Sequence, residues 1–541
     1  MYAGRFLERL LKRYALLCVF GAVVAMRLLF LVTFPLNDLG GDTTNYGAML
    51  RDGTSNLVHA SGYPYLIGPP LGLAQHLLGL GPASSSYFLL ILQHVIDLAV
   101  LVLLYRATRD IFGQPTAAFA VLLAGTSVQS LGVTSAVYPE WLQAGLLVIA
   151  FAAVYYAYAS DRFGRKISLY ALASFAFTWC ILVKFNAAVL SFVFAAAILA
   201  EAQSLRRKAA IAAVCFGVCA TTSAFFILSY HRPSTGTYAL THDKAWVLLS
   251  RIQVAFDNHL DPRNGPNTRR WLALSSVLPR SYDQASAGLF RHLDAVPPEI
   301  RAPYRLKYLH LVTADEAVVN EVLSHSQLPD GFRVGLSAIP VAYYIGLPES
   351  DELGVRVAAE AVRAHPFRFA TSVWRDVRTA LWRWPQGAPF ATADWGLANF
   401  GATVQRTLPL GFVRLSQRTD YGNIPFAHSV PVLWWPGVRL FTYMNAISPF
   451  TRWLVVLAAI ATLAAAIRAA CLRSMDLKSA TTLLLAGVVM VIIVVSSATI
   501  YFRWKEARLV FPILSVVAAT AITMVPAAAG ALAARWRAWR S

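Results

Sequence analysis

Long apolar runs recur along the whole chain and constrain its fold more than any other feature. A membrane-spanning helix needs roughly 20 mainly apolar residues, whereas a barrel strand needs only about 9 to 11. We expect ten such helices, over residues 14–34, 86–105, 115–132, 142–159, 168–183, 187–202, 210–229, 452–470, 481–500 and 509–527. Only 14% of the residues are charged, against about a quarter in soluble domains. The sequence therefore predicts a polytopic α-helical membrane protein.

The basic residues are grouped between these runs, and their grouping predicts the topology. The net charge of +19 comes largely from short clusters near 5–13, 106–109, 162–166, 206–208, 468–478 and 535–540. Short basic loops face the cytoplasm and attract anionic lipids. One orientation places all six clusters and both termini in the cytoplasm. This pattern favours membrane topology over nucleic-acid binding as the reason for the charge.

This topology divides the chain into three parts. We expect an N-terminal transmembrane module (1–229) whose first outer loop (35–85) forms short interfacial helices, an extracytoplasmic domain (230–450), and a C-terminal transmembrane module (451–541). The long outer segment is too large to be a structureless loop, and helical periodicity over 350–382 predicts that it is mixed and mainly helical. The aromatic-rich stretch 430–444 is typical of an interfacial segment that leads back into the membrane. The remaining outer turns are short, at 134–141, 183–187 and 501–508.

No cofactor site is evident in the sequence. The five cysteines lie in or beside apolar runs, and none forms a metal-ligand pattern. No phosphate-binding G-x-x-x-x-G-K-[ST] loop is present. His231, His242 and Asp243 are of the types that bind divalent metals, so a metal there stays an open alternative without a supporting motif.

Five charged residues lie at the outer ends of the predicted spans or in the outer turns. They are Asp42, Glu140, Lys184, Glu506 and Arg508. Ionisable groups near the bilayer are costly and are often functional. Each could also be a solvated loop residue or a cation that reaches the interface. Because the topology puts all five at one membrane level, we expect them to converge on one cavity.

Arg27 is a different case, because it lies inside the first apolar run. A buried arginine needs a carboxylate or carbonyl partner. A structural ion pair with another helix is favoured over direct contact with a ligand.

The order of the motifs resembles the GT-C superfamily of membrane glycosyltransferases. The bacterial relatives of the protein mannosyltransferases and the aminoarabinose transferases that act on lipid A are the most similar in pattern. The resemblance rests on Arg27 in the first span, G-D-x-x-x-Y (Asp42, Tyr46), SGYPYLIGPPLG (61–72), YPEW (Glu140), LVKF (Lys184), AVRAHPFRF (361–369) and E-x-R-x-x-x-P (Glu506, Arg508, Pro512). It covers the first 230 residues well, the last 50 moderately and the middle weakly. Two departures are visible: Thr43 follows Asp42 where many relatives have Asp-Glu, and Leu509 follows Arg508 where many have Arg-Tyr.

The resemblance implies an inverting transfer of a sugar from a polyprenyl-phosphate donor to an acceptor hydroxyl at the outer membrane surface. It implies that Asp42 is the base, with Asp38 as its rival, and that Lys184 and Arg508 hold the donor phosphate. Residues implied to bind or orient the substrates are Tyr46, Tyr63, Glu140 and Glu506. The implied partners are the lipid-linked sugar, a glycan, lipid or protein acceptor, and membrane lipids of a bacterial inner membrane.

Three other functions remain open at this point. One is a non-catalytic assembly or scaffold protein with a degenerate GT-C fold, against which the presence of Asp42, Lys184 and Arg508 together argues. A secondary transporter would also have about ten spans, but it favours charges at the bilayer midplane and two related halves. Neither feature is visible in the sequence. An oligosaccharide polymerase or ligase of the same membrane class would use a similar donor. Neither the sugar nor the acceptor can be named from the sequence.

Overall fold

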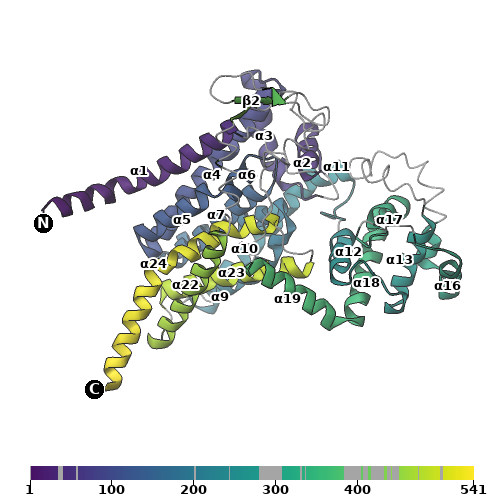
Figure 1. Cartoon of the computed structure of the whole chain (residues 1–541). Helices are drawn as coiled ribbons and strands as arrows, with labels where there is room; N and C mark the ends of the chain where they lie inside the picture. Colours follow the sequence, from purple (N-terminus) through teal and green to yellow (C-terminus); the bar gives the residue numbers. More distant parts are fainter. Residues whose placement is uncertain are drawn as a thin grey trace.

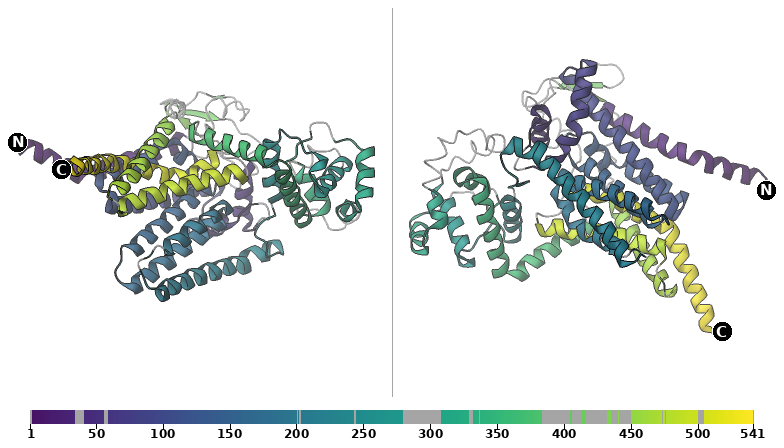
Figure 2. Two further views of the ribbon diagram at one scale, coloured as in Figure 1. Left: turned by 90° about the horizontal axis from the view of Figure 1, so that it is seen from below. Right: turned by 180° about the vertical axis from the view of Figure 1, so that it is seen from behind.

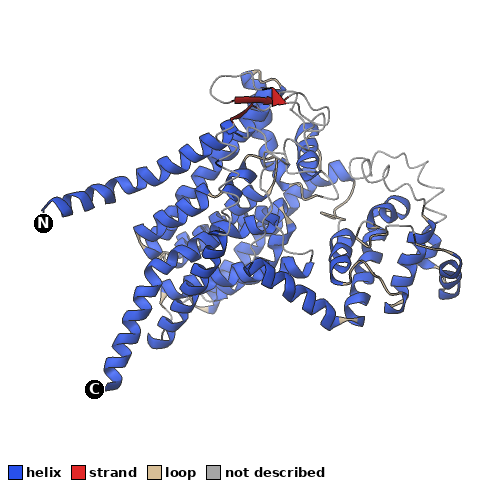
Figure 3. Ribbon diagram, in the orientation of Figure 1, coloured by secondary structure: helices blue, strands red, loops and turns tan. Residues whose placement is uncertain are grey.

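The computed structural model describes most of the chain. Described are residues 2–33, 41–55, 59–199, 201, 203–242, 244–278, 308–328, 332–335, 337–382, 404–405, 412–415, 432–434, 440, 450–472, 474, 476–499 and 504–540. Within helices, the side chains of 2–15, 41–45 and 504–510 are among those not described. Helices dominate the described part (Figure 3).

A bundle of long apolar helices forms the body of the molecule (Figure 1). Its members are α1 (Tyr2–Thr33), α4 (Pro82–Phe112), α7 (Glu140–Tyr158), α8 (Phe163–Val183), α10 (Leu205–Phe226), α22 (Phe450–Leu472), α23 (Leu477–Thr499) and α24 (Trp504–Arg540). Within the described residues, eight helices are long and apolar enough to cross a membrane. The predicted class, a polytopic helical membrane protein, is confirmed.

Two of the ten predicted spans are broken helices. Residues 115–132 fall on α5 (Gln114–Thr126) and α6 (Val128–Thr134), because Ser127 is extended and its side chain caps α6 by accepting from the Ser130 N–H. Residues 187–202 fall on the 3₁₀ segment η1 (Phe185–Leu190) and α9 (Ser191–Leu199). Neither piece reaches the roughly 20 residues of a continuous span.

The directions of the neighbouring helices still require the chain to return through both broken segments. The C-terminal halves of α4 and α7 line one cavity, so these two helices run parallel. On α10, Cys215 and Cys219 contact the carbonyls of Tyr170 and Ser174, so α10 runs parallel to α8. The connections α5–α6 and η1–α9 therefore carry the chain back across the bundle.

A second body of helices forms its own core. It is built from α12 (Lys244–Ala255), α13 (Pro266–Val277), α16 (Glu316–His325), α17 (Ala338–Ile345) and α18 (Leu347–Ala364), around buried side chains such as Leu249, Trp271 and Val357. The helical periodicity predicted over 350–382 is present, and it is divided between two helices, α18 and α19 (Pro366–Trp382). A proline cannot continue the preceding helix without losing a backbone hydrogen bond, so the break falls at Pro366.

The smaller elements complete the description. The first outer loop holds α2 (Gly41–Asp52) and α3 (Gly62–Leu78), so the short helices predicted there are present. After α10 come the π-helical turn η2 (Ile227–His231), α11 (Arg232–Thr235) and, later, η3 (Pro262–Asn264). Strands β1 (Val404–Gln405), β2 (Phe412–Leu415) and β3 (Val432–Trp434) form an antiparallel sheet in the order β1-β2-β3. Most of the predicted segment 430–444 lies outside the described residues.

The two chain ends lie at the same end of the bundle, and the helical body of α12–α18 lies at the other (Figure 1, Figure 2). Helix α19 joins that body to the bundle, where it packs against α23. This arrangement fits a topology in which both termini are on one side of the membrane and the helical body is on the opposite side.

Candidate active site

An ion pair between Glu140 and Lys184 lies where two antiparallel helices meet. Helix α7 begins at Glu140, and α8 ends at Val183 because Lys184 has an extended backbone, with φ −161° and ψ 122°. Lys184 Nζ donates to Glu140 Oε1. The Glu140 side chain is only 1% exposed, whereas that of Lys184 is 25% exposed. The carboxylate is therefore buried at a helix N-terminus, which favours negative charge, and it holds a lysine that still reaches the surface.

Gln143 fixes the turn that carries Lys184. Its Nε2 donates to the carbonyl oxygens of Lys184 at 2.8 Å and Cys180 at 3.3 Å, and to Asn186 Oδ1 at 2.8 Å. The last carbonyls of a helix have no partner within it. Here the Cys180 and Lys184 carbonyls accept from the N–H groups of Lys184 and Ala187, and Gln143 adds a further donor from α7. Sequence reasoning missed this residue, although a glutamine one turn after Glu140 in an apolar run was a signal.

Two acceptor oxygens at this place have no hydrogen-bond partner among the described residues. They are Glu140 Oε2 and Gln143 Oε1, and both are buried. A buried polar atom without a partner costs about 1–3 kcal/mol. Because the two residues are three apart on one helix, they lie on the same face. A ligand hydroxyl or amine that donated to these oxygens would satisfy them.

An aromatic cluster attaches the first outer loop to the start of α7. The ring of Tyr46 on α2 lies 5.7 Å from that of Tyr63 and 6.3 Å from that of Tyr138. Tyr63 donates to Gln93 Oε1 at 2.6 Å, and Trp141 Nε1 donates to the same oxygen at 3.1 Å. Burial raises the pKa of Tyr63 and keeps it a neutral donor. The two tyrosines predicted for the site therefore support the segment beside Glu140.

A glycine brings α3 against the end of α8. A Cβ added at Gly62 would lie 2.6 Å from the carbonyl carbon and oxygen of Leu182 and 2.7 Å from the nitrogen of Val183. Real Cβ atoms essentially never approach so closely. Only glycine lets the start of α3 contact the backbone immediately before Lys184.

The remaining predicted residues are placed by their backbone alone. Asp42 is the second residue of α2, one helical turn before Tyr46, and Glu506 and Arg508 lie in the first two turns of α24. The side chains of these three lie outside the described residues, and Asp38 lies outside them entirely. Just after Arg508, Phe511 and Leu514 share a core cluster with Cys180 and Ala187, on either side of Lys184.

His231 and His242 are held by other contacts. The His231 ring has Nδ1 at 2.6 Å from Ser55 Oγ and Nε2 at 2.8 Å from the Ala239 carbonyl oxygen. His242 lies 3.9 Å from Asp351, and Asp243 lies outside the described residues. Within the described residues, no group of three or more His, Cys, Asp or Glu is arranged to hold a metal ion. The His231 contact instead ties the end of the α2 segment to η2.

Arg27 has the carboxylate partner expected from the sequence. Its Nη2 donates to Asp97 Oδ2 on α4 at 2.5 Å, and its Nη1 lies 3.1 Å from His94 Nδ1. The expected ion pair between helices is present.

Comparison with known proteins returned similarities to solved structures only. No protein-family model and no curated protein sequence matches the chain. It is similar to ArnT from Cupriavidus metallidurans bound to undecaprenyl phosphate (12% identity, TM-score 0.32, 94% of this chain and 77% of that one). It is also similar to the archaeal oligosaccharyltransferase AglB from Archaeoglobus fulgidus in complex with an inhibitory peptide and a dolichol-phosphate (13% identity, TM-score 0.39, 94% of this chain and 50% of that one). The chain thus spans about half the length of AglB.

ArnT and AglB are both GT-C membrane glycosyltransferases. That is the superfamily whose motif order this chain resembles. Since the TM-scores are below 0.5, the function proposed below rests on the chain's own residues.

Proposed function

We propose that this protein is an inverting glycosyltransferase that moves a sugar from a polyprenyl-phosphate donor to an acceptor hydroxyl at the outer face of the membrane. The observation that carries the proposal is the Glu140–Lys184 pair at the end of the bundle away from the termini. Its buried carboxylate has one oxygen without a partner, and its lysine keeps access to the surface.

The chemistry assigns a role to each group. A base, Asp42, takes the proton of the acceptor hydroxyl as that oxygen attacks the anomeric carbon. The bond from the anomeric carbon to the phosphate oxygen breaks, and Lys184 and Arg508 stabilise the charge that grows on the departing phosphate. One displacement inverts the configuration at the anomeric carbon. Asp38 is the alternative base.

Glu140, Glu506, Tyr46 and Tyr63 then orient the reacting groups. Glu140 holds Lys184 through one oxygen and has a second oxygen for a substrate donor. Tyr46 and Tyr63 form part of the buried aromatic cluster that supports α2. With the termini in the cytoplasm, this end of the bundle faces the periplasm or cell exterior, and the protein is integral to the inner membrane.

The test is transfer by purified protein in nanodiscs, supplied with radiolabelled polyprenyl-phosphate sugars and a membrane glycolipid extract. Wild type should transfer label, and Asp42→Asn should bind the donor without transferring it. Lys184→Met should lose both transfer and donor binding. Full transfer by Asp42→Asn would move the base to Asp38. No transfer from any donor by wild type, together with uptake of a solute into proteoliposomes, would replace the proposal with the transporter alternative.

A further inference from the structure

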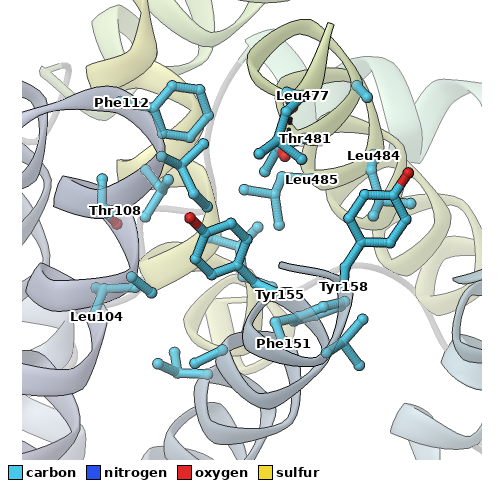
Figure 4. A pocket seen from close by; sticks show the side chains of 18 of the residues that line it. Leu104, Thr108, Phe112, Phe151, Tyr155, Tyr158, Leu477, Thr481, Leu484 and Leu485 are labelled. Atoms are coloured by element: carbon cyan, nitrogen blue, oxygen red, sulfur yellow. Dashed lines mark hydrogen bonds between the residues drawn. The ribbon is translucent and has the colours of Figure 1, made fainter. Parts of the chain in front are cut away.

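A hollow lies in the membrane-spanning bundle, and Figure 4 shows side chains that line it. Its volume is about 320 Å³, and it is bounded chiefly by α4, α7, α23 and α24. Tyr155, which lines it, comes 15 residues after Glu140 on α7, or roughly 22 Å along the helix. The hollow therefore does not belong to the site around Glu140 and Lys184.

The exposure of the lining residues shows that the hollow opens on the outer surface of the bundle. Tyr158, Leu477 and Leu484 at its rim are 46%, 42% and 40% exposed. Thr108 and Phe112 at its floor are each 2% exposed. The medium around a membrane-spanning bundle at this depth is hydrocarbon. A hydrocarbon chain is thus the group that can enter from the rim and reach the floor.

Two hydroxyl groups give this apolar hollow a polar spot. Neither Thr108 Oγ1 nor the Tyr155 hydroxyl has a hydrogen-bond partner among the described residues, and the Tyr155 hydroxyl lies on the Thr108 side of its ring (Figure 4). A hydroxyl group in an apolar environment is costly without a partner. An ester carbonyl, as in the glycerol region of a phospholipid, accepts hydrogen bonds from such donors.

Cations adjoin the lining residues at the same level. Arg109 follows Thr108 near the end of α4, and Lys478 follows Leu477 at the start of α23; both side chains are exposed. Arg109 also pairs with Asp110 at 2.8 Å, so Lys478 is the stronger attraction for an anion. A basic residue near the membrane surface contributes about 1 kcal/mol to the binding of anionic lipid.

We propose that this cavity binds one acyl chain of an anionic phospholipid, with its ester group at Thr108 and Tyr155 and its phosphate beside Lys478. The lipid comes from the leaflet on the side of the chain termini. By filling the space between α4, α7, α23 and α24, it stabilises α7 and α24, the two helices whose N-terminal parts carry Glu140 and Arg508. This inference does not depend on the proposed transfer reaction.

The test is native mass spectrometry of the delipidated full-length protein with added phosphatidylglycerol or phosphatidylcholine of the same chain length. Wild type should bind one phosphatidylglycerol about fivefold more tightly than phosphatidylcholine, the ratio that 1 kcal/mol gives. Lys478→Gln should remove this preference while phosphatidylcholine binding stays the same. Ala152→Phe, which fills the cavity from α7, should abolish the bound copy.

Ala213→Phe is the matched control, because it makes the same substitution at an exposed position on α10 that does not line the cavity. It should bind lipid as wild type does. If Ala152→Phe does not fold, Ala480→Phe fills the cavity from α23. Equal binding of the two lipids by wild type, or a bound copy that survives in both filled variants, would overturn the proposal. Displacement of phosphatidylglycerol by polyprenyl phosphate in wild type, prevented by Ala152→Phe, would assign the cavity to an isoprenoid chain instead.

Discussion

Replacing Gln143 with leucine tests how the turn at Lys184 is held. The change keeps the approximate size of the side chain but removes the amide that donates to the Lys184 carbonyl and to Asn186, each at 2.8 Å. The Cys180 and Lys184 carbonyls keep their bonds from the Lys184 N–H at 3.2 Å and the Ala187 N–H at 3.3 Å, so the acceptor that loses its donor is the half-buried Asn186 Oδ1. One buried group left unsatisfied costs about 1–3 kcal/mol. We expect a free energy of unfolding lower by that amount, measured as a lower thermal midpoint in detergent.

Gln143→Leu should also lower the rate of sugar transfer by the folded protein. If Lys184 loses about 1.4–2.7 kcal/mol of its stabilisation of the departing phosphate, the transfer rate falls about tenfold to a hundredfold. Gln143→Glu keeps the side-chain length but cannot donate when ionised, so it should lose as much activity as Gln143→Leu. The assay is initial-rate transfer from a polyprenyl-phosphate sugar in nanodiscs.

A second glutamine provides the control for this experiment. Gln253 in the outer domain accepts a hydrogen bond from the Gly335 N–H at 2.9 Å. Gln253→Leu should therefore lower the thermal midpoint by a similar amount without changing the transfer rate. A wild-type midpoint and a wild-type rate in Gln143→Leu would show that the turn holds itself and would refute the reasoning.

Three further predictions concern stability and use the thermal midpoint of the full-length protein. Glu360 accepts hydrogen bonds from two N–H groups in the first turn of α13. Burial raises the pKa of Glu360, but these hydrogen bonds have the larger combined effect, so the pKa is lowered. Glu360→Ala should cost about 1–2 kcal/mol, and Glu360→Asp should recover part of that; no loss would exclude a capping role. Arg27→Met leaves Asp97 unpaired and should lower the free energy of unfolding by about 3–5 kcal/mol. The double variant Arg27→Met/Asp97→Leu should recover most of this loss, and an equally unstable double variant would contradict the prediction. Burial lowers the pKa of His242, so on acidification the unfolded chain gains this proton near pH 6.5, and the folded chain gains it only at a lower pH. Stability should fall as the pH drops below that value, and His242→Gln should reduce the fall.

The fold was largely predictable because the apolar runs are long. Eight runs of near-span length are eight helices, and only the two that begin at residues 115 and 187 are broken. The break at Ser127 could not be predicted from hydropathy, because a capping serine inside an apolar run differs little from any other small residue. At Pro366 the sequence did hold the signal, since proline disfavours helix interiors, but the amphipathic periodicity on both sides concealed it.

The site was predictable only in part. Topology alone put Glu140 and Lys184 at one membrane level, and the structure pairs them. Gln143 and Gln93 were missed because their importance depends on partners some 40 residues away in sequence, such as Lys184 for Gln143 and Thr134 for Gln93. A single sequence does not show which polar residue in an apolar run faces another helix. The roles of Asp42 and Arg508 stay predictions, since their side chains lie outside the described residues.

The strongest sign that Glu140 serves a ligand comes from a buried pair elsewhere in the same bundle. Lys166 Nζ donates to Glu201 Oε2 at 2.8 Å, and Tyr170 donates to Glu201 Oε1 at 3.0 Å, so both oxygens of that carboxylate are satisfied. Burying charges is favourable only when their remaining hydrogen bonds are made, and the Glu201 pair meets this condition within the fold. The Glu140–Lys184 pair does not, because Glu140 Oε2 is buried without a partner. Glu201→Gln should therefore lower stability and leave the transfer rate per folded molecule intact, whereas Glu140→Gln should lower the rate at nearly constant stability. The reverse pattern would make Glu140 the structural carboxylate of the two.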